Sequence, residues 1–323
     1  MKSMRRVAVA MFGIMSLIGE GASAQQDYPN KSVRFVVPFA PGGGTDFVAR
    51  LVAQRLGERL GQQLVVDNRA GAGGAIGSNI VAKAAPDGYT LLLGMVSPLA
   101  INPNLEPVPY DPVRDFSAAS LLASSYHVLV VHPSLPVKSV RDLIALAKAR
   151  PGQINYASAG AGTNLFLIGE LFKAATHTDI VHIPYKGTAP AVVAILSGES
   201  QMMFGGVTGV MQHVSGHRLR AIAMTSPKRS PLMPQVPTLI ESGLRGVDVA
   251  SWYALLAPAK TPHSILDRMS RELAQLAASH DYRQEMEKQA FETLSTTPDE
   301  FAPFMKAELE KWARVIKTAG IKQ

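Results

Sequence analysis

The stretch VRFVVPFAPGGGTD, residues 33–46, indicates the fold more clearly than any other part of the chain. It begins with the apolar run Val33–Val37, which predicts a buried strand. A proline- and glycine-rich loop at 38–44 follows, and Thr45 is placed to cap the next helix. The apolar stripe of that helix consists of Val48, Leu51, Val52, Leu56 and Leu60. A strand, a glycine loop and an amphipathic helix in succession are typical of a parallel sheet covered by helices.

The same unit recurs along the chain without any repeat of the sequence itself. In the region 30–124 we expect further strands at 64–66 and 89–93 and a helix at 75–84. In the region 125–249 we expect strands at 128–131, 154–156, 180–183, 201–204 and 219–225, with helices at 139–150, 163–174 and 189–196. A strand at 252–256 and two helices, opened by Thr261-Pro262 and by the box Thr297-Pro298-Asp299-Glu300, complete the chain. The sequence therefore predicts an α/β protein of two lobes.

Composition excludes several classes of function. The chain has 323 residues and no cysteine, so a disulfide scaffold, a cysteine nucleophile, an iron–sulfur cluster and a lipoprotein anchor are ruled out. Its 32 Lys and Arg against 25 Asp and Glu give a net charge of +7, but the basic residues form no long run. We therefore expect no nucleic-acid partner.

The first 24 residues have the features of a secretory signal peptide. Lys2, Arg5 and Arg6 precede an apolar, uncharged run at 7–19, and Ala22-Ser23-Ala24 supplies a small-residue cleavage site. A membrane anchor needs about 20 apolar residues, and Glu20 ends this run too early. We expect cleavage between Ala24 and Gln25 and a mature protein in the periplasm.

Three glycine loops lie between an expected strand and an expected helix, at 41–46, 71–74 and 158–163. Glycine lets backbone amides approach a ligand closely, and the start of the following helix favours an anion. Any one of these loops is equally well explained as a tight turn without a ligand. Three of them at the carboxyl ends of strands, where open α/β sheets bind ligands, favour a site for a carboxylate.

Other chemistries fit the sequence less well. The dinucleotide fingerprint fails because Ile76 stands where the third glycine is required, and no Walker sequence is present. Ser158 as a hydrolase nucleophile lacks the preceding glycine of the elbow, since Tyr156 occupies that position, although His182 or His213 remains a candidate base. His213 and His217 have the spacing of helical metal ligands, but Gly216 favours a surface turn. We expect no metal and no cofactor.

Beyond these patterns, the chain from Tyr28 to Gly320 resembles the Bug family, the periplasmic receptors related to the tricarboxylate-binding component (TctC) of tripartite tricarboxylate transporters. The stretches that carry the resemblance are 36–46 (VVPFAPGGGTD), 66–77 (VDNRAGAGGAIG), 85–93 (APDGYTLLL), 137–156, 158–163, 182–198 (HIPYKGTAPAVVAILSG), 234–243 and 252–262 (WYALLAPAKTP). Several motifs in the expected order make the resemblance specific.

The resemblance implies a monomeric two-lobed binding protein that captures a small carboxylate for a membrane permease, or presents it to a sensor, and not an enzyme. The implied fold is that of type II periplasmic binding proteins, with lobe one at 25–124 and 250–323 and lobe two at 125–249. Lys186 is the implied charge partner of the ligand, or else a solvated lysine after a turn. The residues implied to line the cleft are Phe39, Pro41, Gly42, Gly43, Gly44, Thr45, Asp46, Asn68, Gly73, Gly74, Ser97, Ser158, Ala159, Gly160, Gly162, Thr163, Tyr185, Lys186 and Gly187.

The chain departs from the family pattern at three positions. Phe166 stands where a histidine is usual, and Gln201 and Gly205 stand where aspartates are usual. The loss of two carboxylates near the expected cleft predicts a ligand that is more anionic, or bulkier, than an amino acid.

The cleavage site gives the first testable prediction. Amino-terminal sequencing of the exported protein should find Gln25 first, because the apolar run is too short to span the membrane and ends before an Ala-x-Ala site. Retention of Met1 on the exported protein would contradict the assignment.

Overall fold

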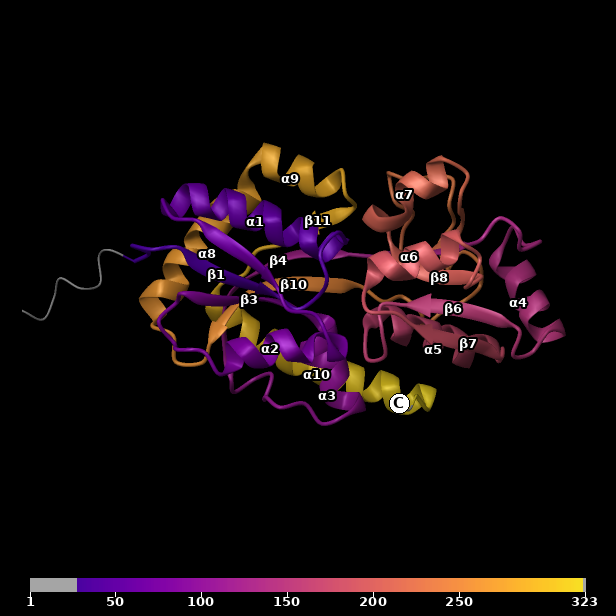
Figure 1. Cartoon of the computed structure of the whole chain (residues 1–323), viewed down its shortest axis with the longest axis horizontal. Helices are drawn as coiled ribbons and strands as arrows, with labels where there is room; N and C mark the ends of the chain where they lie inside the picture. Colours follow the sequence, from indigo (N-terminus) through magenta and orange to yellow (C-terminus); the bar gives the residue numbers. More distant parts are fainter. Residues whose placement is uncertain (1–27, 322–323) are drawn as a thin grey trace, which may run out of the picture.

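Residues 28–321 are described here by a computed structural model, and they form two lobes, each built on one β-sheet (Figure 1). The signal peptide predicted at 1–24 and its cleavage site lie outside the described residues. We call the part built on the six-stranded sheet lobe one and the part built on the five-stranded sheet lobe two. Lobe one lies on the left of Figure 1 and lobe two on the right. The prediction of a two-lobed α/β fold is confirmed.

The sheet of lobe one combines strands from both ends of the chain, in the order β11-β4-β10-β3-β1-β2. Its strands are β1 (Val33–Val37), β2 (Leu64–Asn68), β3 (Thr90–Met95), β4 (Phe116–Ser125), β10 (Ser251–Pro258) and β11 (Phe291–Thr293). β1 pairs in parallel with β2 and β3, whereas β10 runs antiparallel to both β3 and β4. The sheet is therefore mixed and not wholly parallel, because β10 enters it from lobe two in the opposite direction.

The sheet of lobe two has the order β7-β6-β8-β5-β9. Its strands are β5 (His127–Val131), β6 (Ile154–Ser158), β7 (Ile180–Pro184), β8 (Met202–Gly206) and β9 (Arg220–Met224). β6 is parallel to β7 and β8, and β5, which enters from lobe one, is antiparallel to β8 and β9.

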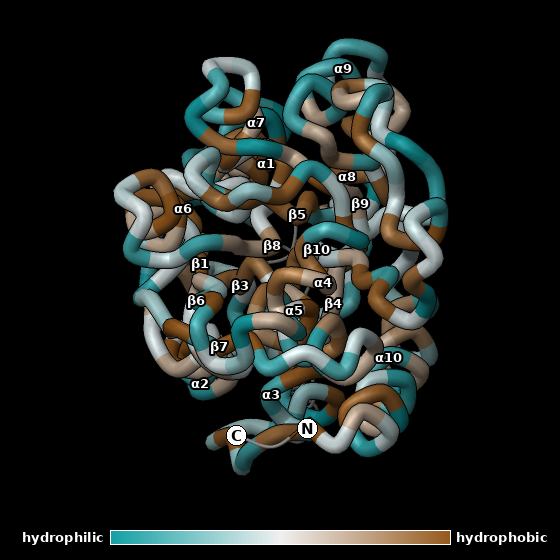
Figure 2. Tube along the Cα trace, turned by 90° about the vertical axis from the view of Figure 1, so that its right-hand side faces the viewer, coloured by the Kyte–Doolittle hydropathy of each residue, from teal (hydrophilic) through white to brown (hydrophobic). Residues whose placement is uncertain are grey.

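Helices pack against both sheets and shield them from solvent (Figure 1). They are α1 (Gly44–Leu60), η1 (Ala72–Gly74), α2 (Ala75–Ala82), η2 (Ser97–Ile101), α3 (Asn102–Leu105), α4 (Val140–Ala149), α5 (Asn164–Thr176), α6 (Thr188–Leu196), α7 (Val207–Ser215), α8 (His263–Ala278), α9 (His280–Glu287) and α10 (Pro298–Ala319). Because of this cover, every residue of β5 and β10 is buried. Figure 2 shows apolar segments gathered around β8 and β10, while the outer turns near α9 are hydrophilic. Within residues 28–321, none of these helices has the length and apolar character needed to cross a membrane.

Two local predictions were wrong, and several elements were not predicted, among them β4 and α7. α1 begins at Gly44 after the N-cap Gly43 and has no side-chain cap, so Thr45 is inside the helix and does not cap it. Pro262 is the N-cap of α8 and not its first residue. β4 was not predicted because its sequence, FSAASLLASS, is rich in alanine and serine, which have little preference for strands. α7 was not predicted because Gly209 and Thr208 weaken the helical pattern; its last turn contains His213.

The chain crosses between the lobes at two neighbouring points. β4 ends in the first sheet at Ser125, and β5 begins in the second sheet at His127. The return crossing leads into β10, whose first residue, Ser251, pairs with Ser125. The two crossing segments therefore lie side by side, as a hinge requires.

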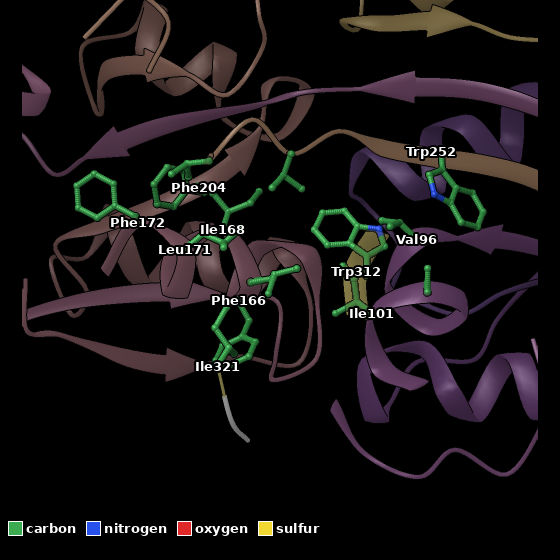
Figure 3. Close-up of a cluster of buried hydrophobic side chains, with 14 of the residues drawn as sticks. Val96, Ile101, Phe166, Ile168, Leu171, Phe172, Phe204, Trp252, Trp312 and Ile321 are labelled. Carbon is green, nitrogen blue, oxygen red and sulfur yellow. The ribbon is translucent and has the colours of Figure 1, made fainter. Parts of the chain in front are cut away.

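α10 packs on lobe one and also reaches lobe two. One buried cluster contains Trp252, Phe301, Trp312 and Ile316 together with Phe166 of α5 (Figure 3). Phe304 and Leu309 of α10 are partly buried and pack against this cluster. Glu308 is 7% exposed, and its Oε2 accepts hydrogen bonds from the indole N–H of Trp252 at 2.8 Å and of Trp312 at 3.0 Å. This carboxylate satisfies two buried donors at once.

Removal of the Glu308 carboxylate should therefore destabilise the fold. We expect Glu308→Ala to lower the free energy of unfolding, measured by urea titration, by about 2–5 kcal/mol, because each buried N–H without an acceptor costs about 1–3 kcal/mol. Glu310→Ala, at an exposed position of the same helix, is the control and should change the value by less than about 0.5 kcal/mol. Equal effects of the two substitutions would refute the role assigned to Glu308.

Candidate functional site

A cavity lies between the lobes, where the starts of four helices meet. Its lining includes Gly44 and Thr45 of α1, Asn164 and Leu165 of α5, Thr188 of α6, and Val207, Thr208 and Gly209 of α7. α1 belongs to lobe one and the other three belong to lobe two. The ends of β1, β6, β7 and β8 all precede these helices, so the strand–loop–helix units of both lobes direct their helix starts towards one space.

Backbone N–H groups are the main polar donors that these helix starts offer. The first turn of an α-helix has N–H groups without intrahelical partners, and it carries a partial positive charge. α5 is capped by Thr163, whose Oγ1 accepts from the N–H of Phe166 at 3.3 Å. α1, α6 and α7 have no side-chain cap. Three uncapped helix starts facing one cavity form a set of donors suited to an anion.

Among residues 28–321, the side chains around this cavity carry no formal charge, since those that line it include no Asp, Glu, Lys or Arg. An anion here is therefore held by neutral donors. Thr45 and Thr188 add hydroxyls near the starts of α1 and α6, whereas the hydroxyls of Thr163 and Thr208 donate to the carbonyl oxygens of Gly160 and Gln289.

Aromatic side chains form the apolar wall of the cavity. Phe39, Tyr253 and Phe291 line it, and the Phe291 ring packs edge-on to Tyr253, with centroids 5.5 Å apart, and stacks on Phe47 at 5.8 Å. Beside Phe291 of this wall, Thr208 Oγ1 donates to the carbonyl oxygen of Gln289 at 2.7 Å, which joins α7 of lobe two to lobe one. The cavity thus suits a small ligand with an apolar body and an anionic end.

The loop of lobe one is held in place by Asp46. Its carboxylate accepts from the N–H of Gly42 at 3.2 Å, from Asn68 Nδ2 at 3.1 Å and from Arg50 Nε at 2.8 Å. Burial alone would raise the pKa of Asp46, but these hydrogen bonds hold the pKa below its usual value. Asn68 also donates to the carbonyl oxygen of Phe39 at 3.0 Å. Asp46 and Asn68 therefore shape the loop and do not line the cavity.

The loop of lobe two is held by Ser158 and Thr163. Ser158 Oγ accepts from the N–H of Gly160 at 3.0 Å, and Thr163 Oγ1 donates to the Gly160 carbonyl oxygen at 2.7 Å. Gly160 has a φ of +122°, so this position requires glycine, whereas Gly43 in the other loop has a φ of −105°.

Ser158 and His182, which the hydrolase hypothesis paired, lie together. Ser158 Oγ is 2.6 Å from His182 Nε2, and the imidazole packs against Tyr156 and Phe166 with ring centroids 4.9 Å and 4.8 Å away. Ser158 is fully buried, at 0% exposure. Because its own loop encloses Ser158 Oγ, the contact with His182 stabilises the loop, and Ser158 is not accessible to a substrate as a nucleophile.

The structure brings five of the residues expected at the site to the cavity lining and leaves the others around it. Those in the lining are Phe39, Gly44, Thr45, Ala159 and Thr163. Those outside it are Pro41, Gly42, Gly43, Asp46, Asn68, Gly73, Gly74, Ser97, Ser158, Gly160, Gly162, Tyr185, Lys186 and Gly187. Lys186 is exposed, so it is not the charge partner of a ligand in this cavity.

All three departures from the family pattern also lie outside the lining. Phe166 packs on His182. Gln201 precedes β8 at the end of the strand remote from α7, where its side chain bonds to the N–H of Asn155 at 2.8 Å and the carbonyl oxygen of Gly198 at 3.1 Å. The expectation that position 201 influences the cleft was therefore wrong. At Gly205 an added Cβ would lie 2.8 Å from Val210, which leaves no room for a side chain.

Residues of α6, α7 and the turn before β11 were missed by the sequence analysis. Among them are Thr188, Thr208, Gln289 and Phe291. The pair Gly205-Gly206, the last two residues of β8 directly before α7, was the available signal. No signal marked Gln289 and Phe291, because only the packing of α9 and β11 brings them to the cavity. No group of three or more His, Cys, Asp and Glu that could hold a metal occurs among residues 28–321.

Two α/β lobes joined by two adjacent crossings, with helix starts facing one interlobe cavity, define a two-lobed ligand-binding protein. The chain belongs to the tripartite tricarboxylate transporter family of receptors, whose family description matches residues 48–321. This membership confirms the resemblance found in the sequence.

Relatives and solved structures agree with the family. Protein BugT of Bordetella pertussis is 38% identical over 318 residues, covering 97% of this chain and 98% of BugT. The structure of Rpa4515 of R. palustris with adipate has a TM-score of 0.88 and 35% identity, covering 92% of this chain and 99% of that one. The periplasmic binding protein BugD has a TM-score of 0.87 and 34% identity, covering 91% of this chain and 99% of BugD.

One buried histidine, His127, and one half-buried histidine, His182, make stability depend on pH. Burial lowers the pKa of His127 to about 4 and the pKa of His182 to about 4; for His182, Glu170 raises the value and Lys173 lowers it. Since the unfolded chain binds these protons near pH 6.5 and the native one only near 4, the free energy of unfolding should fall as pH drops from 6.5 to 4. His127 alone should account for roughly 3 kcal/mol.

Urea titrations across this pH range check the prediction. The variant His127→Asn/His182→Asn should have a flatter pH dependence than the unaltered protein. His280→Asn, at an exposed position, should leave the slope unchanged. An unaltered slope in the double variant would show that other groups control the acid response.

Proposed function

We propose that this protein is a periplasmic receptor that captures a small carboxylate between its lobes for uptake by a transporter of the tripartite tricarboxylate type. The observation that carries the proposal is the convergence of four helix starts, three without a side-chain cap, on a cavity whose lining has no charged side chain. Such a set of neutral donors stabilises an anion and offers nothing to a cation. A carboxylate bound by three or four charge-assisted hydrogen bonds of about 1.5–3 kcal/mol each reaches micromolar affinity.

The similar proteins support the ligand class and the location. Rpa4515, at 35% identity, was solved with adipate, a carboxylate with an apolar body. BugD, at 34% identity, is a periplasmic binding protein. The aromatic wall of Phe39, Tyr253 and Phe291 suits the apolar body of such a ligand.

We also propose boundaries for the two lobes and a partner for the receptor, and we propose that the receptor does not catalyse a reaction. We place lobe one at 25–124 and 250–323 and lobe two at 125–249; the end of β4, the start of β5 and the start of β10, each within two residues of these boundaries, support this division. The partner is an inner-membrane permease, with a sensor as the alternative, and the receptor acts as a monomer without a cofactor. Lobe closure by hinge motion captures the ligand, and the partner opens the lobes.

A ligand panel tests the proposal. Thermal shift and calorimetry would compare adipate, malate and benzoate with their amides, after mass spectrometry of what co-purifies with the native protein. We expect at least one carboxylate to raise the melting temperature and its amide to have no effect. Equal binding of acid and amide, or binding of neither class, would overturn the proposal.

The proximity of Ser158 and His182 makes a secreted hydrolase the second candidate. Turnover of p-nitrophenyl esters that Ser158→Ala abolishes would establish it, whereas stoichiometric binding without product supports the receptor. We expect no turnover, because Ser158 is fully buried.

Gly44 gives a prediction that is specific to the cavity. A Cβ at this position would lie 3.0 Å from Phe291 Cζ and 3.6 Å from Thr208 Oγ1, so a larger side chain occupies the cavity. We expect Gly44→Val to weaken binding of the carboxylate found in the panel at least tenfold, or about 1.4 kcal/mol, with an unchanged circular dichroism spectrum. Lys186→Ala is the control and should change the affinity less than about twofold, roughly 0.4 kcal/mol. A large loss in Lys186→Ala with none in Gly44→Val would place the ligand elsewhere.

A further inference from the structure

A buried group of polar side chains lies where the chain crosses between the lobes. We call Ser97, His127, Asn164 and Ser251 the crossing cluster; their exposures are 0%, 4%, 8% and 1%. Ser97 and Ser251 belong to lobe one, and His127 and Asn164 belong to lobe two. His127 and Ser251 are the first residues of β5 and β10, so each directly follows one crossing.

Asn164 connects every other member of this cluster. Its backbone N–H donates to Ser97 Oγ at 3.0 Å, and its Oδ1 lies 3.5 Å from the same hydroxyl. Its Nδ2 lies 3.1 Å from His127 Nε2 and also donates to Ser251 Oγ. One side chain thus bonds to both crossings and to lobe one.

The imidazole of His127 has a defined hydrogen-bonding direction. Its Nδ1 is 3.4 Å from the carbonyl oxygen of Val249, which can only accept, so the proton is on Nδ1. Nε2 is then the acceptor that receives Asn164 Nδ2, with Ser251 Oγ 3.3 Å away. The Thr225 hydroxyl donates to the same Val249 oxygen at 3.1 Å and accepts from the backbone N–H of His127 at 2.9 Å. The cluster is fully paired only while His127 is neutral.

We propose that Asn164 is a positioning residue that holds the two lobes in the closed arrangement. It directly follows Thr163, the N-cap of α5 and the last residue of the lobe-two loop. A rotation about the crossings that opens the cavity carries α5 away from lobe one, and it breaks the bonds from Asn164 to Ser97 and Ser251. These bonds therefore stabilise the arrangement in which the starts of α1 and α5 face each other. The inference rests on the proposed function in taking closure as the binding step.

Distances between spin labels on the two lobes test this directly. The chain has no cysteine, so Gln54→Cys in α1 and Val193→Cys in α6 give two unique labelling sites; Gln54 is exposed and Val193 is 64% exposed. Pulsed electron paramagnetic resonance would be recorded without ligand and with excess adipate. We expect Asn164→Ala to lower the ratio of closed to open molecules about tenfold in the absence of ligand, because its side-chain hydrogen bonds across the crossing are lost.

Two further variants make the test specific. Ser251→Ala removes one acceptor and should shift the ratio in the same direction by less. Thr176→Val removes a buried hydroxyl of the same helix, which bonds only to Phe172 and Thr178 within lobe two, and should leave the ratio unchanged. Circular dichroism checks that all variants fold. Equal distance distributions in Asn164→Ala and the unaltered protein, or an equal shift in Thr176→Val, would overturn the proposal.

Asn164→Asp provides a readout that a general loss of packing would not give. It presents an oxygen where Nδ2 stood, so closure then requires a proton on His127 Nε2. We expect its closed fraction to rise between about pH 8 and about pH 5.5, while that of Asn164→Ala stays constant. Tyr253 of β10 is the titratable side chain that shares the cavity lining with His127. Nearby, burial and the negative charges of Glu292 and Asp248 raise the pKa of Tyr126. A pH-independent closed fraction in Asn164→Asp would refute the contact with His127.

The experiment also separates the choice of ligand from the role of Asn164. If adipate leaves the distances in the unaltered protein unchanged while Asn164→Ala opens, the choice of ligand fails and the role of Asn164 stands.

Discussion

Backbone N–H groups at the start of a helix have no partner within that helix, and the structure depends on where these groups are placed. In each strand–loop–helix unit the helix starts at the carboxyl edge of its sheet. Two lobes that turn these edges towards each other therefore bring several sets of donors to one cavity. α1 contributes from lobe one, and α5, α6 and α7 contribute from lobe two. Because only α5 among them has a side-chain cap, the cavity keeps its donors for a ligand.

The residues around the cavity have one of two roles: they line it, or they hold its loops in place. Threonines and aromatic rings line it, whereas Asp46, Asn68 and Ser158 bond to the loops from behind. A buried carboxylate that bonds to a loop amide fixes the loop without adding a negative side chain to the lining. The same logic explains Ser158 and His182, whose close contact resembles a catalytic pair but is sealed from solvent.

The connection between the lobes is both short and polar. β4 and β10 pair in the sheet of lobe one up to Ser125 and Ser251, so the two crossings are adjacent and form one hinge. α10 adds an apolar link, since Trp312 and Phe166 share one buried cluster (Figure 3). The crossing cluster differs from this apolar link because hydrogen bonds have a fixed geometry, and one relative orientation of the lobes satisfies them all.

The sequence by itself determined the α/β units, their division between two lobes and three glycine loops, because strand and helix periodicity and glycine are local properties. It also predicted Gly44, Thr45, Ala159 and Thr163, which lie within those loops, and the family resemblance added Phe39; all five line the cavity. Only the tertiary structure decided that Gln289 bonds to Thr208 of α7 and that Phe291 lines the cavity. It also decided that Lys186 faces solvent and that Gln201 lies far from the helix starts. These outcomes depend on the packing of segments distant in sequence, such as β11 beside β4, and on which end of a strand a residue occupies. Local sequence patterns contain no information about such long-range contacts.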